Sequence, residues 1–412
     1  MMLQSLLVLL AVAVAPSLQQ CLTVNDSASQ PHLNDRRALY LGQQNFSLSM
    51  LRKISEGKPT TNVFFSPYST YHALLLAYFG AANATEESLK GTLRIPPTQD
   101  KVATMQAYRL DKTLRNITAT ESYEFRSSNK IYVSDRISLR PCITSLFEEE
   151  VQAIDIFSDP EKAKQTINSW VQMETKDQIK DLIPALNRES KMVLVNAAYF
   201  KGLWQSEFLP ENTRKEVFHI SFTERAFVEM MKQKGSFNYL ISETLGAHIL
   251  ELPYKGEHIS MFILLPPFVK TNGVDEVLKK LNAETMQEFL QDDALSPQSV
   301  EVEVPKFTAE TSQDITHILE KMGAGDAFTD NADFSGFTGA QDVTFDTVMH
   351  KAKIEVDEKG TKAAAATAIF LFRSARPLSP ARFVCNHPFV YLIFDRLSQS
   401  ILFAGVYRTP HN

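Results

Sequence analysis

The sequence predicts an α+β fold in one large domain. Patterns typical of helices dominate the early part of the 412-residue chain, and patterns typical of strands dominate the later part. They do not alternate as regular strand–helix–strand units, which would indicate a parallel α/β fold. Because no internal repeat, low-complexity block or evident linker divides residues 38–412, we expect a single domain there.

The helices are predicted from apolar residues spaced three to four apart and from helix start signals. Ser66-Pro67 is such a signal, because proline is tolerated in a first turn. Asn83 opens a helix whose first turn carries Glu86 and Glu87, a favourable place for negative charge. In chain order, helices are expected at 38–55, after Pro67, from Asn83, at 100–117, at 160–176 and at 274–290.

The strands are predicted from apolar runs and from alternation. Residues 193–204 (VLVNAAYFKGLW) are almost continuously apolar, as in a buried strand, and residues 300–307 (VEVEVPKF) alternate, as in a half-buried strand. Residues 387–395 and 400–408 flank a short polar turn and should form a hairpin. Further strands are expected at 62–65, 123–135, 248–254, 259–267 and 343–360.

The N-terminus predicts secretion. Residues 1–20 contain an apolar run of roughly a dozen residues followed by small residues, which is typical of a signal peptide and too short for a membrane span. Residues 21–37 are polar and are expected to be a flexible leader. Four glycosylation sequons, at Asn25, Asn45, Asn83 and Asn116, agree with an extracellular glycoprotein. The net charge of −6 gives no reason to expect nucleic acid as a partner, and no membrane partner is expected.

The three cysteines are too few for a disulfide framework. Cys21, Cys142 and Cys385 allow one bridge with one free thiol, or three free thiols, and the sequence favours neither arrangement. A large apolar core must therefore stabilise the fold.

No motif of an enzyme is present. The chain lacks the common zinc, nucleotide-binding and nucleophile motifs, and its nine histidines are scattered. We therefore expect no metal, no cofactor and no catalytic residues.

Residues 358–383 (EKGTKAAAATAIFLFRSARPLSPARF) combine opposing preferences. Four alanines favour a helix, TAIFLF favours a strand, and Arg373, Arg376 and Arg382 follow among prolines. An extended, exposed loop that carries arginines is what a trypsin-like protease cleaves, but these residues taken alone favour an ordinary surface loop.

Four motifs give the whole chain a resemblance to the serpin family. They are NVFFSPYSTYHALLLAYFGA from Asn62, LVNAAYFKGLWQSEF from Leu194, HKAKIEVDEKGTKAAAATA from His350, and HPFVYLIFD with ILFAGVYRTP from His387. The chain most resembles the secreted inhibitory serpins of arthropod haemolymph. The resemblance implies a single large domain with a main mixed β-sheet, smaller sheets, about nine helices and an exposed reactive-centre loop at about 358–383.

The resemblance also implies a mechanism. A protease cleaves the loop, the part of the loop before the cut inserts into the main sheet as a new strand, and the acylated protease is trapped. In the alternating pattern, Lys362 belongs to the outward set. The inward set carries no charge, so it can be buried: Thr361, Ala363, Ala365, Thr367, Ile369 and Leu371. The hinge implied by the family comprises Glu358, Gly360, Thr361, Ala363, Ala364, Ala365 and Ala366.

Further residues match family sites by their motif positions. Ser66, Ser69, Asn196 and His350 match the shutter, a buried polar cluster beneath the sheet. Trp204 matches the breach, where the loop first enters the sheet, and Lys306 matches a residue that pairs with Glu358 to hold the hinge. An isolated surface ion pair contributes little by itself.

The reactive bond has two candidates. Counting from the hinge gives Ser374–Ala375, whereas the acidic primary pocket of a trypsin-like protease favours Arg373–Ser374. Arg376 is disfavoured because Pro377 follows it.

The partner predicted from these residues is an extracellular trypsin-like serine protease, held in a covalent complex. The resemblance points to a target in an immune or melanisation cascade. The alternative is a non-inhibitory serpin that acts as a carrier, chaperone or storage protein. A glycosaminoglycan site formed by Lys101, Arg109, Lys112 and Arg115 is not favoured, because Asp111 lies among them and the Asn116 sequon lies next to them.

Overall fold

The computed structural model describes residues 21–23, 26, 33–117, 122–256, 258–270, 272–291, 295–340, 343–359 and 380–411. Ten α-helices lie within these ranges, in agreement with the number of about nine that the resemblance implies. They are α2 (Leu33–Gly57), α3 (Pro67–Gly80), α4 (Asn83–Thr92), α5 (Lys101–Ile117), α6 (Pro141–Leu146), α7 (Pro160–Glu174), α8 (Gly273–Lys280), α9 (Ala283–Leu290), α10 (Thr316–Leu319) and α11 (Ser335–Thr338).

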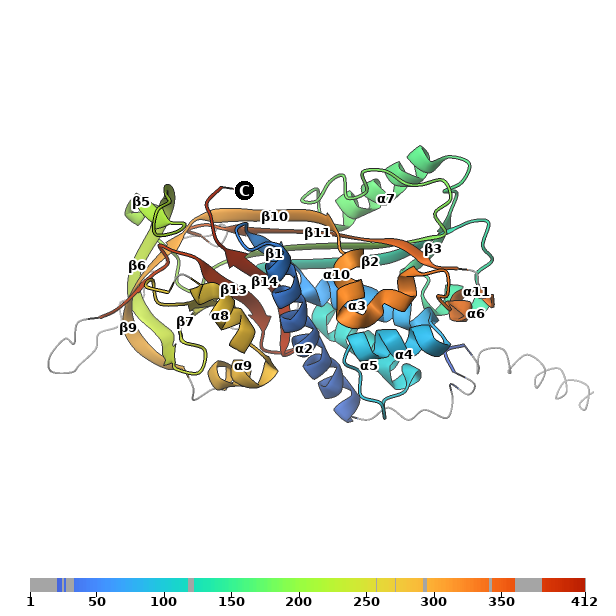
Figure 1. Cartoon of the computed structure of the whole chain (residues 1–412), viewed down its shortest axis with the longest axis horizontal. Helices are drawn as coiled ribbons and strands as arrows, with labels where there is room; N and C mark the ends of the chain where they lie inside the picture. The colour runs from blue at the N-terminus through green and yellow to red at the C-terminus, as the bar shows by residue number, and fades with distance from the viewer. Residues whose placement is uncertain are drawn as a thin grey trace, which may run out of the picture.

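A five-stranded mixed sheet, called here the main sheet, runs along the molecule (Figure 1). Its strands lie in the order β10 (Phe307–Asp314), β11 (Phe345–Val356), β4 (Met192–Gly202), β2 (Tyr123–Ser134) and β3 (Val151–Ile154). Helix α7 covers one face of this sheet through Ile167 and Val171, which pack on Val193, Val195 and Ala197. Helix α3 packs on the other face, against β2 and β4.

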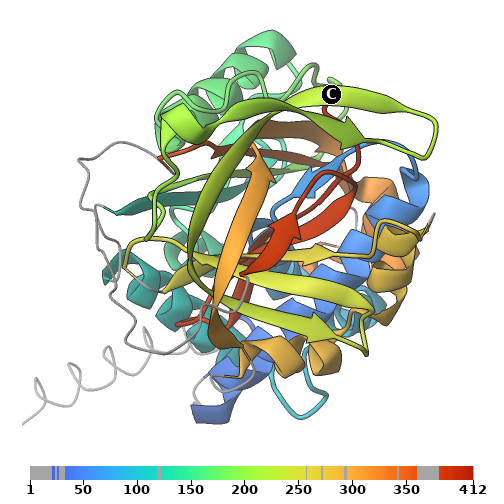
Figure 2. The same ribbon diagram turned by 90° about the vertical axis from the view of Figure 1, so that its left-hand side faces the viewer.

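The remaining strands form one nine-stranded sheet rather than separate smaller sheets. The main path is β1 (Val63–Phe65), β14 (Ser400–Tyr407), β13 (Phe389–Asp395), β8 (Ile259–Leu265), β7 (Ala247–Pro253), β6 (Arg225–Ser242), β9 (Ser296–Pro305) and β12 (Ala381–Val384), and β5 (Arg214–His219) pairs with β6. The reason is the length of β6, whose first half pairs with β5 and whose second half pairs with β7. Figure 2 shows this curved sheet from the end of the molecule that β5, β6 and β9 form. The predicted hairpin is confirmed as β13 and β14.

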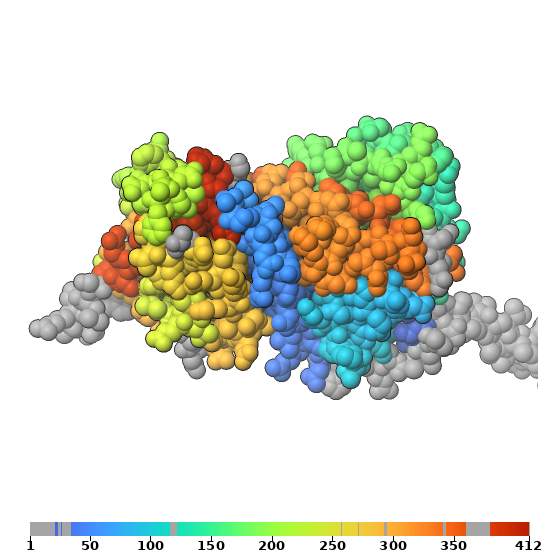
Figure 3. Space-filling model, in the orientation of Figure 1, coloured from blue at the N-terminus to red at the C-terminus, as the bar shows by residue number. Residues whose placement is uncertain are grey.

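The core has two large apolar parts. One lies between the two sheets and the other lies under the helices, where α3 is buried along its whole length. On the surface, α2 lies between the region of α8 and α9 and the region of α4, α10 and α11 (Figure 3). Burial of apolar side chains at ~25 cal/mol per Å² makes these clusters the main source of stability.

Helix boundaries differ from the sequence prediction in two places. Helix α2 begins at Leu33, inside the segment expected to be a leader, although that segment is polar. The predicted helix 274–290 is two helices, because Asn282 begins α9 as an N-cap and forms a capping box with Thr285. The backbone at Leu281 and Asn282 is extended, and this interrupts the helix.

The cysteines form one disulfide. Cys21 is bonded to Cys142, and Cys385 is free and buried. Since residues 21–23 are fixed by this bond and by Asp26, the start of the expected leader is attached to the domain.

Candidate functional site: the seam of the main sheet and the start of the loop

Strands β11 and β4 are neighbours in the main sheet and run parallel to each other. Their register places His350 opposite Asn196 and Ile354 opposite Phe200. We call the boundary between these two strands the seam. It divides the main sheet into a part with β10 and β11 and a part with β4, β2 and β3.

The four predicted shutter residues come together at the middle of the seam. Ser66 and Ser69 lie at the start of α3, Asn196 lies on β4 and His350 lies on β11, and all four are fully buried. The amide of Asn196 donates to Oγ of Ser69, and the backbone N–H of Ser66 donates to Nε2 of His350 at 3.1 Å. The side chains of Ser66, Ser69, Asn196 and His350 all have hydrogen-bond partners, as buried polar groups require.

The hydrogen bonds define the state of His350. Because the Ser66 backbone can only donate, Nε2 accepts, and Nδ1 therefore carries the hydrogen that it donates to Oδ1 of Asn196. Burial lowers the pKa of His350 to about 3. The ring is therefore neutral at physiological pH, and it joins the two strands of the seam without a charge.

Two further residues, which the sequence analysis did not predict, extend the shutter cluster along β2. Ser127 donates to Oγ of Ser69 at 2.9 Å, and the side chain of Asn129 contacts those of Ser69 and Asn196. Residues 127–129 (SSN) lie within the strand predicted at 123–135. They were the signal that could have revealed these contacts, because polar residues in a buried strand need hydrogen-bond partners.

Trp204 holds the chain where it leaves β11. Its indole Nε1 donates to the carbonyl of Asp357 at 2.8 Å, and its backbone N–H donates to the carbonyl of Lys359 at 3.3 Å. The ring is buried and is stacked on Tyr254, with 4.3 Å between the ring centroids. Trp204 therefore fixes the backbone on both sides of Glu358.

Glu358 and Lys306 form an ion pair at the same place. Lys306 Nζ lies 2.7 Å from Oε2 of Glu358, and Thr213 donates to Oε1 at 2.9 Å. Burial tends to raise the pKa of Glu358, but the hydrogen bonds from Lys306 and Thr213 outweigh it and hold the pKa below its usual value. Thr213 was missed, because nothing in the sequence distinguishes it.

The prediction of one strand over 300–307 is wrong at Lys306, which does not lie inside a strand. It lies between β9, which ends at Pro305, and β10, which starts at Phe307. Its backbone N–H donates to Glu229 on β6 at 2.8 Å, so the chain passes here from one sheet to the other. This corner directs the lysine toward Glu358.

The other predicted hinge residues and the reactive-bond residues lie outside the described residues, whereas residues 381–383 at the end of the predicted loop belong to β12. The residues outside are Gly360, Thr361, Ala363, Ala364, Ala365, Ala366, Arg373, Ser374 and Ala375. The chain is described again from Pro380, and β12 pairs with β9 in parallel.

Of the four sequons, Asn25 is outside the described residues. Asn45 lies exposed on α2, Asn83 lies exposed at the start of α4, and Asn116 lies in the last turn of α5. The side chain of Asn83 also donates to Asp333 at 2.7 Å.

The structure argues against the glycosaminoglycan site. Lys101 is buried and bonds to Glu86 and to the carbonyl of Ala81, and Lys112 pairs with Glu149 and Glu150. Arg115 pairs with Asp395 and lies over the ring of Tyr68. Of the four residues, Arg109 alone is exposed, and its guanidinium donates to the carbonyl of Leu146. They therefore form no basic surface.

Two kinds of feature are absent from the described residues. In that part of the chain, none of the helices has the length and apolar character needed to cross a membrane. The same residues contain no group of three or more histidines, cysteines or carboxylates arranged to hold a metal ion.

Comparison with known proteins agrees with the fold. Residues 41–410 match the family model described as serpin (serine protease inhibitor). The chain is 41% identical to serine protease inhibitor 88Ea of Drosophila melanogaster, over 92% of each chain, and 32% identical to the human leukocyte elastase inhibitor, over 89% of this chain and 97% of the relative. The structure of Serpin48 from the insect Tenebrio molitor, described as highly specific, superposes with a TM-score of 0.78 at 31% identity, covering 92% of this chain and 99% of that one. The chain therefore belongs to the serpin family of serine protease inhibitors.

Proposed function

We propose that this serpin is a secreted suicide inhibitor of a trypsin-like serine protease. Cleavage of the loop near Arg373–Ser374 is followed by insertion of the loop into the seam, which traps the acylated protease. The observation that carries the proposal is the parallel pairing of β11 with β4, directly before the loop.

A parallel pair is the arrangement that a returning strand can separate. The segment after β11 must reverse direction to enter the sheet, so it would run antiparallel to β11 and also to β4. β11 has 12 residues, Phe345–Val356, and the segment 361–372 has the same length. A fully inserted segment would therefore reach from the Trp204 end of the seam to its other end.

Energy favours such an insertion once the loop is cut. About ten new backbone hydrogen bonds at ~0.5–1.5 kcal/mol each give on the order of 5–15 kcal/mol, before apolar burial is added. This is comparable with the whole stability of a typical protease domain, so deformation of an attached protease is energetically feasible. The inward set of loop residues, from Thr361 to Leu371, buries no charge.

The choice of target rests on Arg373. An arginine before the cut suits an acidic primary pocket, and the relatives named above are inhibitors by name. Secretion is supported by residues 1–20 and by the sequons, and a cascade of the immune or melanisation type agrees with the similarity to insect serpins.

The test is incubation with trypsin in equimolar amounts. The expected result is a complex that resists SDS and boiling, and a C-terminal fragment that starts at Ser374 when the sample is denatured and weighed by mass spectrometry. A start at Ala375 would instead identify the other bond and an elastase-like target. An Arg373→Ala variant should lose the trypsin complex, whereas the matched Arg382→Ala variant should retain it. Cleavage without a complex, and without a gain in heat stability, would assign the protein to the non-inhibitory serpins.

A further inference from the structure

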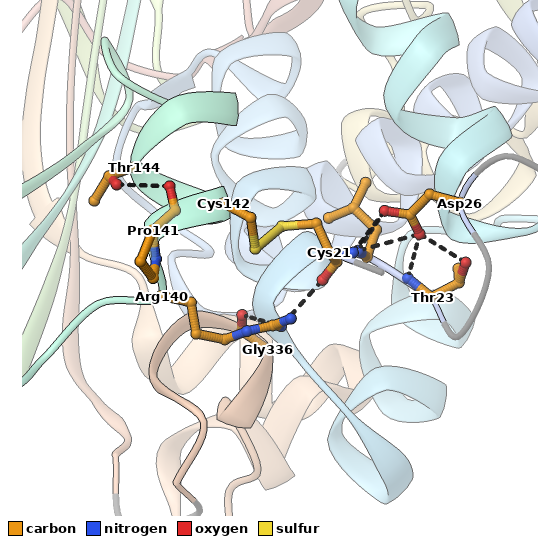
Figure 4. The surroundings of a disulfide bond; sticks show 9 residues. Cys21, Thr23, Asp26, Arg140, Pro141, Cys142, Thr144 and Gly336 are labelled. Atoms are coloured by element: carbon orange, nitrogen blue, oxygen red, sulfur yellow. Dashed lines mark hydrogen bonds between the residues drawn. A yellow bond between two sulfur atoms is a disulfide. The ribbon is translucent and has the colours of Figure 1, made fainter. Parts of the chain in front are cut away.

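A second set of contacts joins the two sides of the seam at the end remote from Trp204. Figure 1 shows α6 and α11 at this end of the molecule, opposite β5, β6 and β9. Here the disulfide between Cys21 and Cys142 attaches residues 21–23 to the start of α6 (Figure 4). The carboxylate of Asp26 accepts the backbone N–H groups of Cys21, Leu22 and Thr23, at 2.6–2.9 Å, which fixes the conformation of this short segment.

Arg140 connects this segment to α11. Its guanidinium NH1 donates to the carbonyl of Cys21 at 3.1 Å and to the carbonyl of Gly336 at 3.0 Å, and its backbone N–H donates to the carbonyl of Phe337 at 2.8 Å. Figure 4 shows the guanidinium between the two carbonyl oxygens. One arginine thus joins three segments that are distant in the sequence.

These segments belong to opposite sides of the seam. Arg140 and α6 lie between β2 and β3 in the chain, and α6 packs against β3. Helix α11 precedes β11, and its N-cap residue Phe334 packs edge-to-face on Phe345 at the start of β11, with 4.8 Å between the ring centroids. A movement of β4, β2 and β3 away from β11 therefore changes the distance between Arg140 and α11.

A carboxylate reinforces the same end of the seam. Oδ2 of Asp346, on β11, accepts the backbone N–H of Lys191 at 2.7 Å and that of Met192 at 3.4 Å. Met192 is the first residue of β4 and pairs with Phe345. A strand of 12 residues that enters at Trp204 would reach this position last.

We propose that Arg140 and the Cys21–Cys142 disulfide form a latch that limits how fast the remote end of the seam opens. Arg140 is a positioning residue of the insertion step, and the disulfide holds the carbonyl of Cys21 in place for it. This inference rests on the proposed inhibitory function, because it concerns the same seam. It predicts that the latch slows complete insertion, spontaneous insertion of the uncut loop included.

Three variants test the latch. Arg140→Ala removes both guanidinium bonds and keeps the disulfide, and Cys21→Ser with Cys142→Ser removes the disulfide and keeps Arg140. Arg136→Ala is the matched control, because Arg136 lies in the same connection but is exposed and contacts the ring of Phe157, not α11.

The measurement is the rate at which a synthetic peptide of residues 361–372 anneals to each intact variant, followed by native gel and by the gain in heat stability. Because the guanidinium makes two charge-assisted hydrogen bonds across this contact, the first two variants should anneal roughly tenfold faster than the wild type. The control should stay within about twofold of the wild type. Equal rates for all four proteins would overturn the latch.

Removal of the disulfide lowers stability mainly by freeing the unfolded chain, and that effect cannot change the rate of a step within the folded state. Faster annealing of the disulfide variant therefore reports on the latch and not on a general loss of stability. Arg140→Lys keeps the charge but lacks the fixed planar geometry of the guanidinium, so it should also anneal faster than the wild type. The assay contains no protease, so failure to inhibit trypsin and failure of the latch are distinguishable outcomes.

Discussion

Asn196 on β4 and His350 on β11 are joined by a hydrogen bond that crosses the seam, and both side chains are fully buried. The bond uses Nδ1–H of a neutral ring whose other nitrogen accepts from Ser66. Protonation of the ring would place a hydrogen on Nε2 and so remove the acceptor of the Ser66 backbone N–H, while the bond to Asn196 would remain.

Stability should depend on pH through His350. Burial lowers the pKa of His350 to about 3 in the folded state, against an ordinary value of about 6.5 in the unfolded chain. Between these values the unfolded state binds more protons, so the free energy of unfolding falls as the pH falls from about 6.5 toward 3. At pH 5 the loss due to this group is about 2 kcal/mol. Urea unfolding at pH 7 and pH 5 measures it, and a His350→Gln variant should lose about 2 kcal/mol less than the wild type over this interval. An identical loss in both proteins would contradict the assignment.

The Lys306–Glu358 pair should show weak coupling. Lys306 is 46% exposed and Glu358 is 11% exposed, so solvent screens much of their attraction. A double-mutant cycle with Lys306→Ala and Glu358→Ala should give a coupling energy of about 0.5–1 kcal/mol in thermal unfolding. Glu358→Ala alone should cost more than Lys306→Ala, because it also leaves the hydroxyl of Thr213 without this partner. Equal single effects would indicate that Thr213 finds another acceptor.

The two faces of the hinge should differ in their tolerance of charge. Ala365→Arg places a cation in the inward set, where an inserted strand would bury it, so the protein should become a substrate that trypsin cleaves without a stable complex. Ala364→Arg places the same cation in the outward set and is the matched control, which should retain most of the complex. SDS gels after mixing with trypsin give the fraction trapped. Comparable loss of the complex in both variants would refute the assigned alternation.

Removal of the disulfide should lower global stability. The bond closes a loop with a sequence separation of 121 residues, so its loss should lower the free energy of unfolding by about 2–4 kcal/mol. Chemical unfolding of the Cys21→Ser, Cys142→Ser protein measures this loss, and Cys385 remains as a buried thiol in both proteins. An unchanged midpoint would show that the unfolded chain keeps residues 21 and 142 close together without the bond.

Sequence patterns predicted both strands of the seam, because β4 is a long, almost continuously apolar run and β11 alternates between apolar and polar residues over much of its length. The motif positions also grouped Ser66, Ser69, Asn196 and His350, which the fold brings together in one cluster. Sequence patterns failed where contacts between distant parts of the chain determine the local structure. Nothing local shows that Asn282 ends one helix and begins another, that Lys306 stands between two sheets, or that Lys112 faces Glu149 and Glu150. The pairing of Cys21 with Cys142 could not be predicted either, since three cysteines permit several arrangements.

The chain beyond the loop has a further consequence. Strands β13 and β14 are buried along their whole length inside the second sheet, and β12 is paired with β9 at its edge. A cut at Arg373–Ser374 would therefore divide the polypeptide without dividing the molecule, because residues 389–407 supply interior strands that cannot leave without exposing the core. The nicked protein should migrate as one species in native conditions and as two only after denaturation.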